Sequence, residues 1–155
     1  MSLSLREKLK LSIIEKEART IIKNISNKLQ IDGKLLTFES RDYNAFLSKT
    51  IDDIDYQPQD LSINENRLFS RFCDFVNLIK TNDLVYFQII TLNDYYYLKL
   101  PINYINQDPT LFWNLKVNNS NKMLECLLVA ENNSFGFSIL PSEYCYEFRR
   151  WFFRP

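Results

Sequence analysis

The alternation of apolar and polar positions is clearest over residues 84–100, which read LVYFQIITLNDYYYLKL. Val, Ile, Tyr and Phe dominate both halves of this stretch, and these residue types suit a pleated, half-buried strand. Asn93 and Asp94 interrupt the run and can supply turn geometry. The stretch therefore predicts a β-hairpin in which Phe87 lies opposite Leu98 on an apolar face.

The position of the reversal also predicts what lies on the second face of this hairpin. A slip of one residue would expose Phe87 and Leu98 and bury Lys99, so the period of two specifies the register. A reversal centred on residues 92–93 places Gln88 opposite Tyr97. The second face then collects three tyrosines and two polar residues: Tyr86, Tyr95, Tyr97, Gln88 and Lys99.

Two segments carry the three- and four-residue spacing of an amphipathic helix. The first, residues 3–31, predicts one long helix or two in succession, ended by Asp32 and Gly33. We expect its apolar stripe to cover the apolar face of the sheet. Its frequent Lys and Arg residues are typical of attachment to a membrane surface or nucleic acid, but three interspersed glutamates favour an ordinary solvated face. The second segment is residues 66–81.

A second hairpin is predicted over residues 123–140, reversing at Asn132 and Asn133. In this register Val129 lies opposite Gly136. A missing side chain at that position lets an aromatic ring or a helix approach closely.

The other segments give weaker patterns. Residues 35–38 and 111–117 alternate loosely and predict two short strands. Pro58 and the absence of a period predict a loop over residues 50–66. The tail, residues 141–155, has aromatic residues at helical spacing and predicts a short C-terminal helix.

These elements predict an α+β fold in a single domain, residues 1–155, which is an ordinary size for one domain. An antiparallel sheet of about four to five strands is built from the hairpins at 84–100 and 123–140. A long N-terminal helix, a middle helix at 66–81 and a short C-terminal helix accompany the sheet.

Composition mainly excludes kinds of catalytic and metal-binding site. Hydrophobic residues make up 46% of the chain and aromatic residues 15%, which indicates a folded domain. Histidine is absent, which removes Ser/His and Cys/His nucleophile systems and imidazole metal sites. The two glycines, Gly33 and Gly136, cannot form a glycine-rich phosphate loop. Cys73, Cys126 and Cys145 form no CxxC spacing, so neither a disulfide framework nor a zinc cluster is expected, and no cofactor is implied.

Charge and hydropathy bear on location and partners. The 19 Lys and Arg residues balance 19 Asp and Glu residues, so net charge gives no reason to expect nucleic acid. No apolar run is long enough to cross a bilayer, and the N-terminus lacks the pattern of a secretory signal. A cytoplasmic location is expected.

Residues 50–66 carry an uneven charge, with five acidic residues and no basic one. Asp52, Asp53 and Asp55 suggest a Mg²⁺ or Ca²⁺ site, but the calcium-loop pattern and its glycine are missing, so no metal is expected. An acidic loop of this kind can instead steer a partner with a basic surface, such as the cleft of a nuclease, or remain a plain solvated loop.

The favoured hypothesis is a non-catalytic protein-binding module, similar in general character to an immunity-type inhibitor or a subunit of a larger assembly. Aromatic and arginine residues in the tail are types enriched where binding energy concentrates, although a docked helix would explain them equally. The candidate partner-binding residues come from the acidic loop, the tyrosine-bearing face and the tail: Asp52, Asp53, Asp55, Asp60, Tyr86, Tyr95, Tyr97, Arg149, Arg150 and Trp151.

Two alternative functions stay open. Tyrosines on an open sheet face can stack the unpaired bases of single-stranded nucleic acid, although only Lys99 accompanies them to neutralise phosphate. A carboxylate-dependent enzyme of unknown class is the other alternative, but no spacing identifies a catalytic residue.

Overall fold

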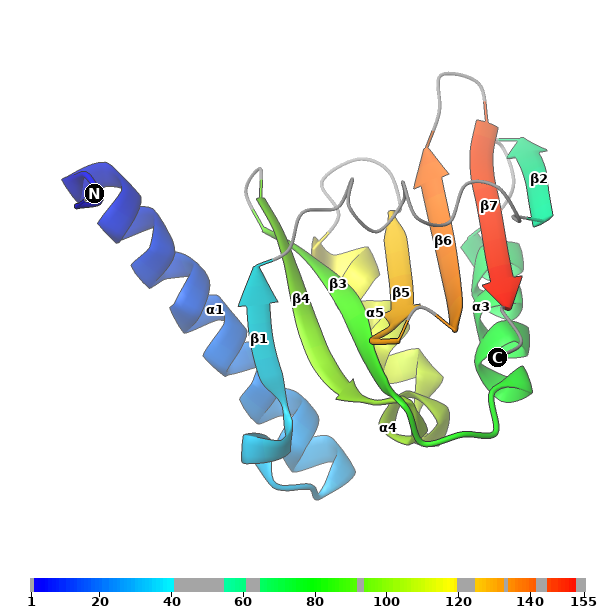
Figure 1. Ribbon diagram of the computed structural model, residues 1–155, viewed down its shortest axis with the longest axis horizontal. Helices are drawn as coiled ribbons and strands as arrows, with labels where there is room; N and C mark the ends of the chain where they lie inside the picture. Colours follow the sequence, from blue (N-terminus) through cyan, green and yellow to red (C-terminus); the bar gives the residue numbers. More distant parts are fainter. Residues whose placement is uncertain are drawn as a thin grey trace.

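The computed structural model describes residues 2–40, 55–60, 65–91, 94–119, 125–132, 134–141 and 145–152. It is organised around one antiparallel sheet of seven strands in the order β1-β4-β3-β5-β6-β7-β2 (Figure 1). The α+β class is confirmed, with more strands than the four to five predicted. The strands are β1 (Thr37–Ser40), β2 (Asp55–Asp60), β3 (Leu84–Thr91), β4 (Asp94–Pro101), β5 (Cys126–Ala130), β6 (Phe135–Pro141) and β7 (Cys145–Phe152). The helices are α1 (Leu5–Leu29), the short 3-10 helix η1 (Gly33–Leu35), α3 (Glu65–Leu78), α4 (Ile102–Gln107) and α5 (Pro109–Asn119).

Both predicted hairpins are present in the predicted register. Every predicted pair between β3 and β4 is observed, Phe87 with Leu98 among them. Val129 of β5 pairs with Gly136 of β6, and Gly136 also pairs with Trp151 of β7. A Cβ atom added to Gly136 would lie 1.9 Å from Cζ2 of Trp151. The close aromatic approach expected at this glycine is therefore confirmed.

Local chemistry sets both ends of α1, which is one helix. Ser4 and Glu7 form a capping box in which Glu7 Oε2 accepts a 2.7 Å hydrogen bond from the N–H of Ser4, and Ser4 Oγ accepts one of 3.2 Å from the N–H of Glu7. Hydrogen bonds to the Glu7 carboxyl from the backbone N–H of Ser4 and then from its side chain hold the pKa of this carboxyl below its ordinary value. The predicted stop was wrong in detail, because Gln30 and not Gly33 takes the left-handed conformation (φ 53°).

Residues 111–117 belong to helix α5, so the strand predicted there was wrong. Asp108 accepts a hydrogen bond of 3.1 Å from the N–H of Leu111, and Pro109 occupies the first helical position. An acidic cap followed by proline is a helix start, because proline lacks the N–H that a first turn leaves unpaired. Residues 102–107 form α4.

The tail and part of the acidic segment are strands, which corrects the predicted C-terminal helix and the predicted loop. β7 pairs with β6 on one side and with β2 on the other. Aromatic residues spaced as in this tail satisfy a helical stripe and a strand equally well, and pairing on both sides favours the strand. Pro58 is tolerated because β2 is at the edge of the sheet and pairs on one side only, which is where strands accept proline.

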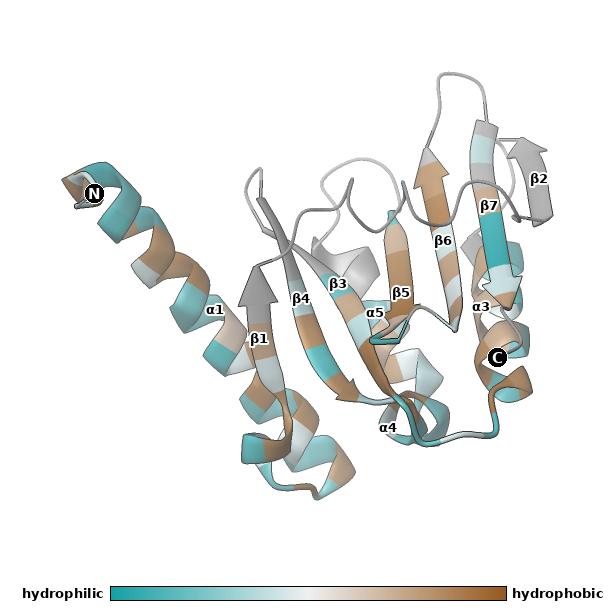
Figure 2. Ribbon diagram, in the orientation of Figure 1, coloured by the Kyte–Doolittle hydropathy of each residue, from teal (hydrophilic) through white to brown (hydrophobic). Residues whose placement is uncertain are grey.

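The main core lies between one face of the sheet and the helices. Figure 1 shows α3, α4 and α5 behind the sheet, while α1 lies alongside β1. Phe72 of α3, Phe112 of α5, and Phe87 and Leu98 of the hairpin are fully buried in one cluster. Figure 2 shows hydrophobic residues concentrated along the central strands above these helices. The expectation that α1 covers this face was only partly right, because α1 contributes Ile25 to the cluster while α3, α4 and α5 supply most of the cover.

Candidate functional site

On the tyrosine-bearing face of the sheet, the two tyrosines whose side chains are described are buried. Tyr86 and Tyr97 are 1% and 0% exposed, and their rings meet edge to face with centroids 6.4 Å apart. Lys99 Nζ lies 5.6 Å from the centre of the Tyr86 ring and forms a 2.9 Å ion pair with Glu131. Trp151, 2% exposed, belongs to the same cluster. Rings this buried stabilise the sheet and leave no face on which an unpaired base can stack.

The acidic segment and the arginines of the tail are neighbours in the sheet. Asp55 of β2 pairs with Arg150 of β7, and Asp60 pairs with Cys145 further along the same two strands. Arg149 lies on the opposite face of β7 from Arg150, because successive strand residues alternate. The acidic segment and the tail, which the sequence suggests as two separate surfaces, therefore form one two-stranded edge of the sheet.

Five of the candidate residues are placed less fully. Asp52 and Asp53 lie outside the described residues, and Asp55, Asp60 and Tyr95 are placed by strand register alone. Within the described ranges, no group of three or more Cys, Asp or Glu residues could hold a metal ion.

The two cysteines whose side chains are described have the character of structural residues. Cys126 is fully buried in the main core, and Cys73 is half-buried on α3. Burial, together with the negative charge of Asp74, raises the pKa of the Cys73 thiol. A nucleophilic cysteine reacts as its thiolate, and a raised pKa makes that form scarce.

We expect Cys73 to react with iodoacetamide more slowly than a free cysteine at about pH 8.5. Its reaction rate should also keep increasing as the pH rises above the pKa of a free thiol. Asp74→Asn removes a like charge, lowers the pKa of Cys73 and so should raise this rate. Peptide mass spectrometry of the native protein measures both rates, and buried Cys126 is the internal control for unfolding. A rate equal to that of free cysteine, unaffected by Asp74→Asn, would contradict the assignment.

The first three turns of α1 expose a set of large apolar side chains. Leu5, Leu9 and Ile13 are 74%, 58% and 51% exposed. Figure 1 shows this half of α1 extending past β1, away from the sheet. We call Leu5, Leu9 and Ile13 the N-terminal patch. No described helix is long and apolar enough to cross a membrane.

Sequence reasoning missed this patch because it placed all apolar residues of α1 on one stripe. An α-helix turns about 100° per residue, so positions 5, 9 and 13 lie within about 80° of one another. Ile14, Ala18 and Ile25, which are buried, point to roughly the opposite side. The angular position of these residues around the helix, and not merely their spacing, indicated the exposed patch.

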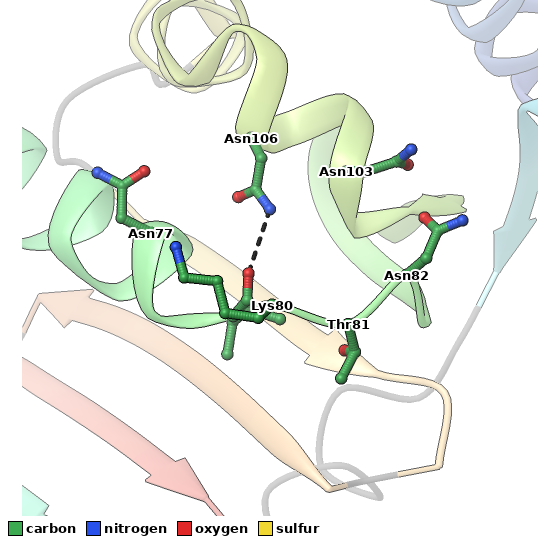
Figure 3. Close-up of a pocket in the computed structure, with 7 residues that line it drawn as sticks. Asn77, Lys80, Thr81, Asn82, Asn103 and Asn106 are labelled. Atoms are coloured by element: carbon green, nitrogen blue, oxygen red, sulfur yellow. Dashed lines mark hydrogen bonds between the residues drawn. The ribbon is translucent and has the colours of Figure 1, made fainter.

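A polar cleft lies between α4 and the connection from α3 to β3. Its volume is about 420 Å³, within the range of small-ligand sites. Figure 3 shows Asn106 reaching from α4 toward that connection, with Asn77 and Lys80 on one side and Asn82 and Asn103 on the other. The lining consists of Asn77, Ile79, Lys80, Thr81, Asn82, Asn103 and Asn106.

Neither a protein-family model nor any curated protein or solved structure matches the chain.

Proposed function

We propose that this protein is a non-catalytic protein-binding module that contacts its partner through the N-terminal patch. The observation that supports this proposal is the exposure of Leu5, Leu9 and Ile13 together on one side of a projecting helix. A single exposed leucine is ordinary, but a contiguous apolar patch with a polar rim marks a contact surface. An amphipathic helix that offers residues at four-residue steps commonly binds in an apolar groove.

The charges beside the patch define the chemistry of the partner. Arg6, Lys8 and Lys10 are exposed around it, and the one carboxylate within this stretch, Glu7, is hydrogen-bonded in the capping box. A groove with an acidic rim complements this arrangement. A second copy of the chain would bring these cations together and is disfavoured.

An immunity-type inhibitor and a subunit of a larger assembly both fit this mode of binding. The hypothesis of an acidic loop that steers a basic partner stays a prediction, because Asp52 and Asp53 lie outside the described residues and Asp55 is placed by strand register alone. Binding of single-stranded nucleic acid through the tyrosine face loses support because Tyr86 and Tyr97 are buried.

Replacing Leu5, Leu9 and Ile13 together by alanine should raise the Kd for the partner about 100-fold, because each truncation removes about 1 kcal/mol of apolar burial. Alanine keeps the helix, so the free energy of unfolding should change by less than about 0.5 kcal/mol. Leu35→Ala, an equally exposed leucine in η1, is the matched control and should leave Kd unchanged. An unchanged Kd in the triple variant would remove the patch from the interface.

The partner can be identified with a photo-crosslinking amino acid placed at position 9 of the full chain. Asn27 is the control position, because it is exposed and lies five turns further along the same side of α1. The proposal expects a single protein adduct from position 9 and none from position 27. The purified partner should then bind, and Lys8→Gln with Lys10→Gln should slow its association at low salt. Adducts only with a second copy of this chain, binding only to vesicles of anionic lipid, or no adduct at all would each overturn the proposal.

A further inference from the structure

The cleft between α4 and the α3–β3 connection has walls that are fixed relative to each other. The N–H of Ile102 donates a 2.9 Å hydrogen bond to the carbonyl oxygen of Asp83 at one end. Asn106 Nδ2 donates a 3.4 Å bond to the carbonyl oxygen of Ile79 at the other (Figure 3). The backbone walls of a cleft held in this way require little reorganisation when a ligand binds.

Two hydrogen-bond acceptors in the lining are buried and unused. The side-chain oxygens of Asn103 and Asn106 are shielded from solvent, and no described group donates to either of them. The orientation of the Asn106 amide is set by its bond to Ile79, so its oxygen cannot exchange places with its nitrogen without losing that bond. Buried acceptors without partners are costly and uncommon. A ligand that carries hydroxyl groups would satisfy both oxygens once small movements of the two side chains open them to the cleft.

The other lining residues narrow the class of ligand. Lys80 supplies the one charge among the seven lining residues, and no carboxylate lines the cleft. An anionic group is therefore favoured near Lys80. No aromatic ring lines the cleft, so it lacks a platform for stacking a nucleobase. Asn77, Asn82 and Thr81 add donors and acceptors suited to neighbouring hydroxyl groups.

From these observations we infer that the cleft is a binding site for a small polyhydroxylated anion of the sugar-phosphate class. The buried oxygens of Asn103 and Asn106 accept hydrogen bonds from its hydroxyl groups, and Lys80 pairs with its anionic group. The cleft is formed by residues 77–82 and 103–106, and none of its lining belongs to the N-terminal patch, so the site is independent of the proposed partner contact.

The test is a titration of the full chain, followed by two-dimensional NMR of backbone and asparagine side-chain amides. The three probes are glucose 6-phosphate, glucose and inorganic phosphate. Glucose 6-phosphate is expected to shift resonances of residues 77–82 and 102–106 with a Kd of about 1 mM or tighter, and to bind at least about tenfold more tightly than either of the other probes. Asn103→Ala should weaken its binding about tenfold by removing one acceptor.

Two further variants test the role of Lys80 and the location of the site. Lys80→Gln should remove the preference for glucose 6-phosphate over glucose, while Asn114→Ala, an exposed asparagine on α5 outside the cleft, should change nothing. Thermal unfolding of each variant separates loss of binding from loss of fold. Equal binding of inorganic phosphate and glucose 6-phosphate would show a simple surface anion contact and overturn the assignment. Absence of shifts in the cleft at about 10 mM of every probe would overturn it as well.

Discussion

Replacing Gly136 by alanine is expected to lower the free energy of unfolding by about 3 kcal/mol, at the upper end of the usual cost of overpacking. The added methyl group would lie 1.9 Å from Cζ2 and 2.3 Å from Cε2 of the Trp151 ring. These distances are far below van der Waals contact, and Trp151 is 2% exposed, so its ring is enclosed by neighbouring groups that must shift if it moves. Chemical denaturation followed by tryptophan fluorescence measures the change.

The second glycine of the chain provides the matched control. A Cβ atom on Gly33 would meet its nearest neighbour, Ser26 Oγ, at 3.6 Å, and Gly33 does not adopt a positive φ. Gly33→Ala should therefore be neutral or stabilise by up to about 1 kcal/mol, because alanine restricts the unfolded chain. In a Trp151→Leu background, adding Gly136→Ala should cost less than about 1 kcal/mol, since the clashing ring is gone. An equal cost in both backgrounds would show that the ring is not the cause.

Phe72→Ala is expected to destabilise the protein by about 4 kcal/mol, the typical cost of deleting a fully buried aromatic ring. Phe72 of α3 is 0% exposed and touches rings from three other elements. The centroid distances are 6.3 Å to Phe87 of β3, 5.6 Å to Trp113 of α5 and 5.7 Å to Phe137 of β6. Removing the ring leaves a cavity where these elements meet, and equilibrium unfolding in urea measures the loss.

Leu78→Ala is the control on the same helix. Leu78 is 56% exposed at the end of α3, and its truncation should change the free energy of unfolding by less than about 0.5 kcal/mol. A loss of less than about 1.5 kcal/mol for Phe72→Ala would mean that the core around α3 is packed loosely or arranged differently.

The fold was predictable where the signal is local. The register between β3 and β4 follows from a period of two on both sides of a short reversal, and a shift of one residue would bury Lys99. The same logic gave the pairing of Val129 with Gly136 and the approach of an aromatic ring. α1 and α3 followed from long helical periodicity. Long periodic segments allow only one secondary structure to bury their apolar residues.

Two of the errors occurred in short segments rich in aromatic residues. Residues 111–117 and the tail have apolar positions that fit a helix and a strand equally well. Asp108 and Pro109 indicate a helix start as well as a turn, and only the packed α5 shows which applies. The tail became β7 because β6 and β2 pair with it on both sides, and β2 is far from it in sequence.

The two candidate sites also differ in how far the sequence predicts them. The N-terminal patch is implicit in the sequence, because the angular phase of positions 5, 9 and 13 separates them from the buried side of α1. The cleft is not implicit in the sequence, because residues 77–82 and 103–106 are brought together only when α4 folds against the α3–β3 connection.

By itself, the sequence determined the helices α1 and α3, the two hairpins with their registers, and the absence of histidine chemistry. The tertiary structure decided that Tyr86 and Tyr97 of the tyrosine face are buried, that acidic and arginine-bearing strands are neighbours, and that an amide-lined cleft exists. The physical reason is range: periodicity and turn chemistry act over a few residues, whereas burial and strand order depend on contacts between distant segments.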